Sequence, residues 1–306
     1  VTGVQTCALP ILGVKGPIPV VSWQHGTILS FDSVPSGLLK LADPSYITTD
    51  QADSLETLLN VHRFAGQGFA VIAADYVGKG PFRNGRGEGY AVKAVTTQAC
   101  LRMLEAGQRT LNALGLETGP LFLNGWSQGG LNTQWLHQAL RRLGIAVTGT
   151  SVSSPFNELS ETMRFWSGVG SYPPVDGQSS YPAMPPWISL CMIILIGSYE
   201  LHYGMKGLMR SAVAPEFRSM AETYWKTYDV RFALGKPFPT GATLLGWQVR
   251  DLLAFAGESH APTAENVILF WNGGGMTRID TWDPKPGRPT AGEFKPVKTS
   301  VPGIEI

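Results

Sequence analysis

The chain has 306 residues, enough to bury a substantial core in one α/β domain that carries an insertion. Its 24 basic and 23 acidic residues nearly cancel, and a net charge of +1 provides no electrostatic attraction for nucleic acid or an anionic membrane. The three cysteines and five histidines have no disulfide or metal-binding spacing, so neither a metal nor a cofactor is expected.

The first eleven residues look foreign to the rest of the chain. Val1–Ile11 reads VTGVQTCALPI, the translation of a nucleotide string that resembles a common sequencing-library adapter. We therefore expect native sequence to begin near Leu12 and Cys7 to have no role in the protein. The true N-terminus is then missing, so nothing follows about a signal peptide.

From Pro17 onward, apolar runs typical of strands alternate with helical patterns. Strands are predicted at residues 18–23, 69–74, 121–123 and 146–152. Helices are predicted at residues 53–65, from about 90 to 114, and from about 130 to 143. This alternation predicts an α/β fold with a mainly parallel central sheet.

The strand pattern stops near residue 155, where Tyr, Trp, Pro and Met become frequent. We interpret 155–240 as an inserted helical cap, with 12–154 as the core and 241–306 as the remainder of the core. The apolar run 187–197 covers about 11 residues, fewer than the roughly 20 that a membrane-spanning helix needs. It is therefore expected to be a buried or cap helix, not a transmembrane segment.

One motif carries the chemistry. Gly125-Trp-Ser127-Gln-Gly129 has the pattern G-x-S-x-G and stands between a predicted strand and a predicted helix. A nucleophile in this position stands on a sharp, strained turn, and the residues two places away on each side must be small for the turn to close. The sequence therefore predicts Ser127 as a nucleophile above the edge of the sheet.

A second motif, His25-Gly26-Thr27, directly follows the first predicted strand. In folds with a nucleophile elbow, a loop after an early strand donates one backbone N–H to the oxyanion, and the residue after the nucleophile donates the other. We therefore expect Gln128, Gly26 and Thr27 to form an oxyanion hole. His25 precedes the nucleophile and is expected to shape its loop.

Together these segments resemble the secretory-lipase branch of the α/β-hydrolases. The resemblance rests on Val20–Thr27, Ala73–Gly80, Glu88–Val92 and Gly125–Gly130. It implies an α/β-hydrolase fold with a helical cap over an apolar acyl pocket, a Ser–Asp–His triad, and esterase or lipase activity without a cofactor. It also places Asp75 in a structural turn and makes secretion a possibility, although the compartment cannot be deduced from the sequence.

The two other triad members do not follow the expected order of Ser, acid, then His near the C-terminus. His137 lies on a polar helix face and His202 lies in the predicted cap, so His260 is the only late candidate for the base. Its acid would be Asp229 or Asp251, neither of which follows a strand. The late apolar run at residues 267–271 precedes Asp280 and Asp283, but no histidine follows them. We therefore expect the chain to be truncated, frameshifted or rearranged from about Leu245 onward.

The sequence supports one main function and leaves alternatives. The main one is a serine hydrolase that cleaves carboxylic esters of a small molecule or lipid through an acyl-enzyme, with no nucleic-acid partner. A catalytically incomplete hydrolase-fold chain that binds apolar ligands, and an acyltransferase or peptidase on the same fold, remain open. The loop 78–89, with Lys79, Arg83 and Arg86, is interpreted as a solvated surface loop and not as a phosphate or RNA site.

Overall fold

A computed structural model of the chain describes residues 5–8, 16–30, 33–37, 53–81, 83–170, 172–174, 177–181, 184–185, 187–229 and 239–246. The chain divides into two compact units, Val1–Glu265 and Asn266–Ile306. All described residues belong to the first unit.

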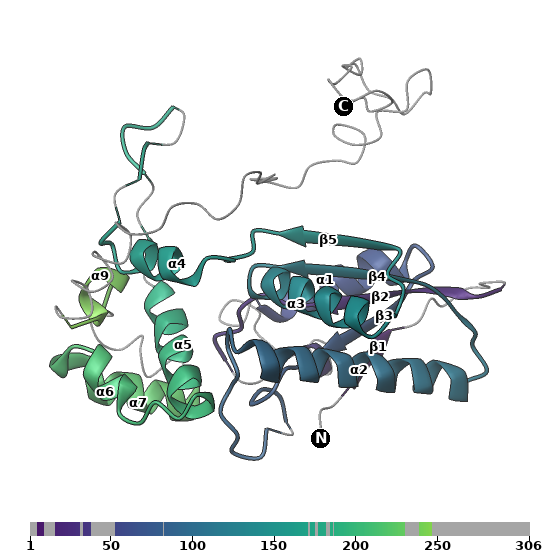
Figure 1. The fold of residues 1–306 in the computed structure, drawn as a ribbon, viewed down its shortest axis with the longest axis horizontal. Helices are drawn as coiled ribbons and strands as arrows, with labels where there is room; N and C mark the ends of the chain where they lie inside the picture. Colours follow the sequence, from purple (N-terminus) through teal and green to yellow (C-terminus); the bar gives the residue numbers. More distant parts are fainter. Residues whose placement is uncertain are drawn as a thin grey trace, which may run out of the picture. The chain divides into compact units, whose positions relative to one another are not determined.

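A five-stranded sheet with the order β1-β3-β2-β4-β5 forms the centre of this unit (Figure 1). The strands are β1 (Gln5–Ala8), β2 (Ile18–Gln24), β3 (Ala70–Ala74), β4 (Thr118–Trp126) and β5 (Gly149–Ser153). The last four run parallel, because β2 pairs in parallel with both β3 and β4, and β4 pairs in parallel with β5. The four strands predicted between residues 18 and 152 are thereby confirmed, as is the mainly parallel sheet.

The edge strand β1 was not expected. Gln5–Ala8 pairs antiparallel with β3, from Gln5 opposite Ala74 to Ala8 opposite Val71. Backbone pairing at an exposed sheet edge needs no particular side chains, so a peptide of any origin can occupy it. The adapter origin of Val1–Ile11 therefore stays a prediction.

Helices cover both faces of the sheet. α1 (Asp53–Ala65) packs on one face, where Val21, Trp23 and Val71 meet Val61 and Phe64. α2 (Lys93–Ala113) and α3 (Gln128–Arg142) cover the other face, and all three helices lie close to their predicted positions. Because both faces are covered, every side chain of β3 is buried, which explains its uninterrupted apolar sequence.

Beyond β5 the described chain is helical. It contains α4 (Leu159–Trp166), α5 (Ile188–His202), α6 (Leu208–Ala212), a 3₁₀ turn η3 (Pro215–Phe217), α7 (Arg218–Thr227) and α9 (Gly241–Leu244). We call residues 155–246 the helical segment. Its core surrounds α5, which is buried from Ile188 to Ser198, as predicted for the apolar run. In the portion of the chain that the structure covers, no helix is long and apolar enough to cross a bilayer.

Candidate active site

Ser127 lies on a sharp turn between the end of β4 and the start of α3. Its backbone has φ 54° and ψ −119°, a conformation that a residue with a side chain rarely adopts. Strain of this kind persists only where the surrounding structure enforces it, and it is concentrated at functional sites. Here the Ser127 N–H donates to the Ser153 carbonyl of β5 at 2.9 Å, and the Ser127 carbonyl accepts from Leu131 at 3.2 Å.

The two glycines of the motif are required by contacts across the turn. A Cβ at Gly125 would collide with the Gly129 carbonyl and the Thr133 hydroxyl. A Cβ at Gly129 would collide with the Gln24 carbonyl at the end of β2. The close approach of α3 to β4 and β2 therefore depends on both glycines, in agreement with the reasoning from the sequence.

The loop after β2 lies beside this turn, because Gln24 and Gly125 are neighbours in the sheet. The Gly26 N–H donates to both carboxylate oxygens of Glu56 in α1, each at 3.2 Å. The Thr27 hydroxyl shares a 2.8 Å hydrogen bond with the Tyr90 hydroxyl. The Trp126 ring covers Gly26, where an added Cβ would come within 2.8 Å of it. The predicted oxyanion residues are thus brought to one edge of the sheet, but the Gly26 amide is already engaged.

His25 is buried inside this loop. Its Nδ1–H donates to the Gly26 carbonyl at 2.7 Å, and its ring stacks on Tyr76 with centroids 4.1 Å apart. The Tyr76 hydroxyl in turn donates to the His25 carbonyl at 3.0 Å. Burial lowers the pKa of His25 to about 4, so the ring is neutral near pH 7. These contacts agree with the prediction that His25 shapes its loop.

The other described histidines lie elsewhere. His62 is exposed in the last turn of α1, His137 lies 3.1 Å from the Thr150 hydroxyl, and His202 donates to the Glu88 carbonyl at 3.0 Å. In the part of the chain that the structure describes, no histidine forms a hydrogen bond with Ser127. His260 lies outside the described residues.

The described aspartates do not identify the acid of the predicted triad. Asp251, Asp280 and Asp283 also lie outside the described residues. Asp229 follows α7, and its N–H donates to the Thr227 hydroxyl at 3.2 Å. Asp75 follows β3 and accepts from the Ser36 N–H at 2.9 Å, which fits a structural turn. Burial raises the pKa of Asp75 to about 6, against the opposing effect of the Ser36 hydrogen bonds.

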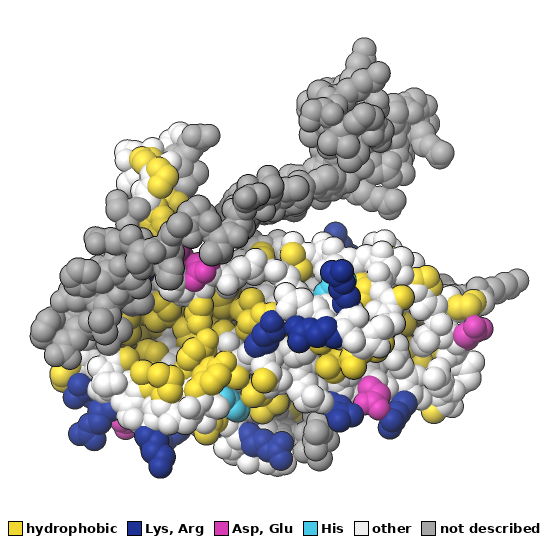
Figure 2. Space-filling view, viewed as in Figure 1, with side chains coloured by type: hydrophobic (Ala, Val, Ile, Leu, Met, Phe, Trp, Pro, Cys, Tyr) yellow, Lys and Arg dark blue, Asp and Glu magenta, His cyan; other side chains and the backbone are white. Residues whose placement is uncertain are grey.

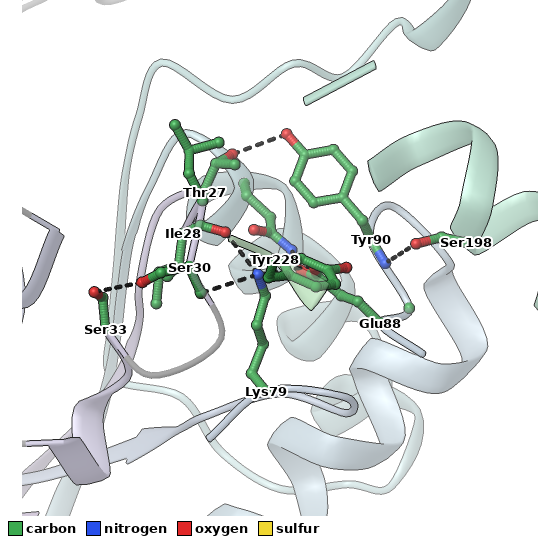
Figure 3. A network of polar contacts seen from close by, with 12 residues as sticks. Thr27, Ile28, Ser30, Ser33, Lys79, Glu88, Tyr90, Ser198 and Tyr228 are labelled. Carbon is green, nitrogen blue, oxygen red and sulfur yellow. Dashed lines mark hydrogen bonds and ion pairs between the residues drawn. The ribbon is translucent and has the colours of Figure 1, made fainter. Parts of the chain in front are cut away.

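The interpretation of 78–89 as a solvated loop is wrong at both ends of the range, where residues 78–80 and 88–89 are buried. The side chains of Lys79 and Glu88 are 0% and 1% exposed and form an ion pair of 3.1 Å. Figure 3 shows Lys79 and Tyr228 converging on Glu88, and the Lys79 ammonium lies 4.0 Å from the centre of the Tyr228 ring. No periodic pattern in the sequence reveals this arrangement, because Lys79 and Glu88 lie in a loop and Tyr228 lies in the distant helical segment.

This buried ion pair contacts the residues that follow Thr27 and the side chain of Gln128. The Lys79 Nζ donates to the Ile28 carbonyl at 2.6 Å and to the Ser30 carbonyl at 3.4 Å. The Glu88 carboxylate accepts from the Gln128 side-chain amide at 3.4 Å and from the Tyr228 hydroxyl at 3.0 Å. The sequence analysis did not identify Glu88 or Tyr228 as part of the site.

Hydrophobic side chains gather on the face drawn in Figure 2. In the helical segment, exposed large apolar residues include Trp187 at the start of α5 and Leu201, Tyr203 and Met205 around its end. Trp126, next to Ser127, is 49% exposed. A large exposed apolar surface is typical of a binding site for an apolar ligand or a protein segment.

No protein-family model matches the sequence, and no curated protein matches it significantly. Several solved structures are similar. One is a protein from Legionella pneumophila provisionally assigned as a hydrolase, with 17% identity and a TM-score of 0.64, covering 82% of this chain and 60% of that one. Another is the rice cell wall degrading esterase LipA from Xanthomonas oryzae, with 18% identity and a TM-score of 0.61, covering 82% of this chain and 62% of that one. The chain has the α/β-hydrolase fold.

A third similar structure is that of Candida antarctica lipase A, with 17% identity and a TM-score of 0.55. The similarity covers 80% of this chain and 51% of the lipase, so the chain spans about half of that protein and less than two thirds of the other two. The structures confirm the fold class expected from the sequence, and two of these neighbours are an esterase and a lipase.

Proposed function

We propose that this α/β-hydrolase is a serine hydrolase that cleaves carboxylic esters through an acyl-enzyme at Ser127. The observation that carries the proposal is the backbone of Ser127, held at φ 54° between β4 and a helix that only glycines allow to approach. The esterase and lipase activities of LipA and Candida antarctica lipase A support the same chemistry.

In the proposed reaction, the Ser127 hydroxyl oxygen attacks the ester carbonyl carbon while a base accepts its proton. The carbonyl oxygen becomes an oxyanion, which accepts hydrogen bonds from the Gln128 N–H in the first turn of α3 and from the loop at Gly26 and Thr27. The alcohol leaves with the proton held by the base. Water then attacks the acyl carbon and gives a proton to the base; the bond to the Ser127 oxygen breaks, that oxygen takes the proton back, and the acid is released.

The two loop donors differ. The Gly26 N–H donates to Glu56, so it becomes available to an oxyanion only when that carboxylate is displaced. A donor at Thr27 requires no such displacement of Glu56. We therefore infer that Thr27 is the principal loop donor and that Gly26 contributes only when Glu56 moves away.

His260 is the proposed base. The sequence has five histidines, and His25, His62, His137 and His202 have the positions described above, none of them bonded to Ser127. A serine hydroxyl without a base is a poor nucleophile. With His260 as the base, the acid partner stays open between Asp229 and Asp251.

The proposed substrate is a small ester or lipid with an apolar acyl group. The exposed apolar side chains of the helical segment and Trp126 beside Ser127 would accept such a chain. In this proposal the helical segment acts as the cap over the acyl site, and neither a metal nor a cofactor takes part.

The first test is hydrolysis of p-nitrophenyl butyrate by the full chain beside Ser127→Ala. Turnover should vanish in Ser127→Ala and persist in Ser153→Ala, because Ser153 contacts the turn through its backbone carbonyl. Turnover that survives in Ser127→Ala would exclude Ser127 as the nucleophile.

A catalytically incomplete chain that binds apolar ligands is the second candidate. It is favoured by one observation: none of the histidines in the described ranges is bonded to Ser127. A folded protein that shows no Ser127-dependent turnover but binds a fatty acid would establish this alternative.

A further inference from the structure

The buried ion pair between Lys79 and Glu88 lies between the two elements that supply the oxyanion donors. We propose that Lys79 and Glu88 are positioning residues that hold the Thr27 loop and Gln128 in a fixed relation to each other. This inference rests on the proposed function, because it assigns the pair to the oxyanion hole of that reaction.

Lys79 fixes the first element. Its ammonium donates to the carbonyl of Ile28 at 2.6 Å, one residue beyond Thr27, and to the carbonyl of Ser30 at 3.4 Å. A charged donor to a backbone carbonyl forms a stronger hydrogen bond than a neutral donor does. The loop that follows β2 is therefore fastened directly after the proposed donor.

Glu88 fixes the second element. One carboxylate oxygen accepts from the side-chain amide of Gln128 at 3.4 Å, and the other lies 3.1 Å from the Lys79 ammonium. The contact with Gln128 is long, but both side chains are buried, and a hydrogen bond in a dry interior is electrostatically stronger than one in water. Gln128 is thereby linked to the loop after β2 through one ion pair.

The helical segment supports the pair from a third direction. The Tyr228 hydroxyl donates to Glu88 at 3.0 Å, and the Tyr228 ring lies against the Lys79 ammonium. The His202 side chain donates to the Glu88 carbonyl at 3.0 Å. The side chain of Glu88 thus has acceptor contacts with three groups, which leaves its carboxylate little freedom to turn.

Stability alone does not account for such a pair. Burying two charges costs desolvation energy that the attraction between them often fails to recover, and apolar residues of similar volume are frequently as stabilising. An oxyanion hole, in contrast, gains from donors that are fixed before the charge develops. The location of the pair between both proposed donors therefore favours a role in positioning.

The test replaces both charges together, because Glu88→Gln alone would leave Lys79 buried without its partner. The double variant Lys79→Met with Glu88→Gln keeps similar volumes, and its fold is checked by circular dichroism and thermal unfolding. With p-nitrophenyl butyrate, we expect kcat to fall at least about tenfold while KM changes less than about twofold. The matched control, Arg109→Met with Glu105→Gln, removes an exposed ion pair in α2 and should leave both constants unchanged.

A second measurement does not depend on catalysis. Amide hydrogen exchange in the peptides covering 24–30 and 125–131 should become several-fold faster in the double variant, whereas the peptide covering 100–111 in α2 should not change. Unchanged exchange in both site peptides, a kcat within about twofold of the wild type, or an effect on KM alone would overturn the inference. If the wild type shows no Ser127-dependent turnover, the proposed function fails, and the exchange result still decides whether the pair positions the two elements.

Discussion

Glu56 holds the backbone N–H of Gly26 with both oxygens of its carboxylate, each at 3.2 Å. This places a negative charge at the amide that was expected to serve the oxyanion. A fixed carboxylate near a developing oxyanion raises the energy of the transition state, because like charges repel most strongly where water is excluded.

We therefore expect Glu56→Gln to increase kcat for a short p-nitrophenyl ester by about two- to tenfold, since the amide oxygen of Gln still accepts from Gly26 but carries no charge. Steady-state kinetics on the purified variant measure this effect. Glu105→Gln on α2 is the control, because Glu105 is exposed and, among the described residues, pairs only with arginines of its own helix. A fall in kcat for Glu56→Gln would show instead that the charge of Glu56 is needed to hold the loop.

Gly129→Ala should be strongly destabilising. Its Cβ would collide with the Gln24 backbone, which cannot rotate away as a side chain could. We expect the free energy of unfolding to fall by more than about 3 kcal/mol, together with loss of turnover. Urea unfolding followed by tryptophan fluorescence measures the change. Gly149→Ala in β5, whose Cβ would meet only the Phe122 ring, should cost much less. Equal losses for both variants would contradict the argument.

Stability should depend on pH through two buried groups with opposite effects. The pKa of His25 is lowered to about 4, so as pH falls His25 takes up a proton in the unfolded chain before it does so in the folded chain. The contribution of His25 to the free energy of unfolding therefore decreases as pH falls from about 6.5 to 4. The pKa of Asp75 is raised to about 6, so this contribution weakens the fold as pH rises from about 4 to 6. Each shift of roughly 2 units corresponds to about 3 kcal/mol, so the two contributions nearly cancel in the same range.

Asp75→Asn should expose the effect of His25 alone. We expect the free energy of unfolding of this variant to rise more steeply between pH 4 and pH 6.5 than that of the wild type. Urea titrations at intervals across this range provide the measurement. Parallel curves for the two proteins would mean that Asp75 titrates in the folded chain as it does in the unfolded one.

His260→Ala should abolish the turnover that depends on Ser127, because removing the base leaves a serine hydroxyl with its ordinary weak nucleophilicity. We expect kcat to fall by at least about a thousandfold. His137→Ala is the matched control, since His137 contacts Thr150 and has no place in the proposed reaction. Retained activity in His260→Ala would require another base and would remove His260 from the proposal.

The strands β2 to β5 and the helices α1, α2, α3 and α5 could be predicted because each one leaves a periodic or continuous apolar pattern, whereas β1 leaves none. β3 is apolar throughout because helices cover both of its faces, and α1 ends at Ala65 as the following Gly66 indicates. The turn at Ser127 could be predicted because two glycines flank it at a fixed spacing. The contacts that require those glycines come from Gln24 and Thr133, which no local pattern identifies.

The polar surroundings of the turn were beyond prediction for a physical reason. Lys79 is buried because the Ile28 carbonyl, Glu88 and the ring of Tyr228 surround it, and two of these groups, Ile28 and Tyr228, lie far from Lys79 along the sequence. A charged residue among glycines is usually solvated, so the sequence favoured the wrong interpretation. The Glu56–Gly26 contact was missed because these two residues are also far apart in the sequence.

The contacts of Glu88 with Tyr228 and His202 also constrain how this protein could be engineered. If the proposed function holds, replacing the helical segment with that of a protein of the same fold is an obvious way to alter acyl preference. Here such a graft would remove two of the groups that hold Glu88, and through Glu88 it would disturb the turn at Ser127. A chimaera that keeps the donor hydroxyl of residue 228 and the imidazole of residue 202 should therefore exchange specificity with less loss of rate than one that discards them.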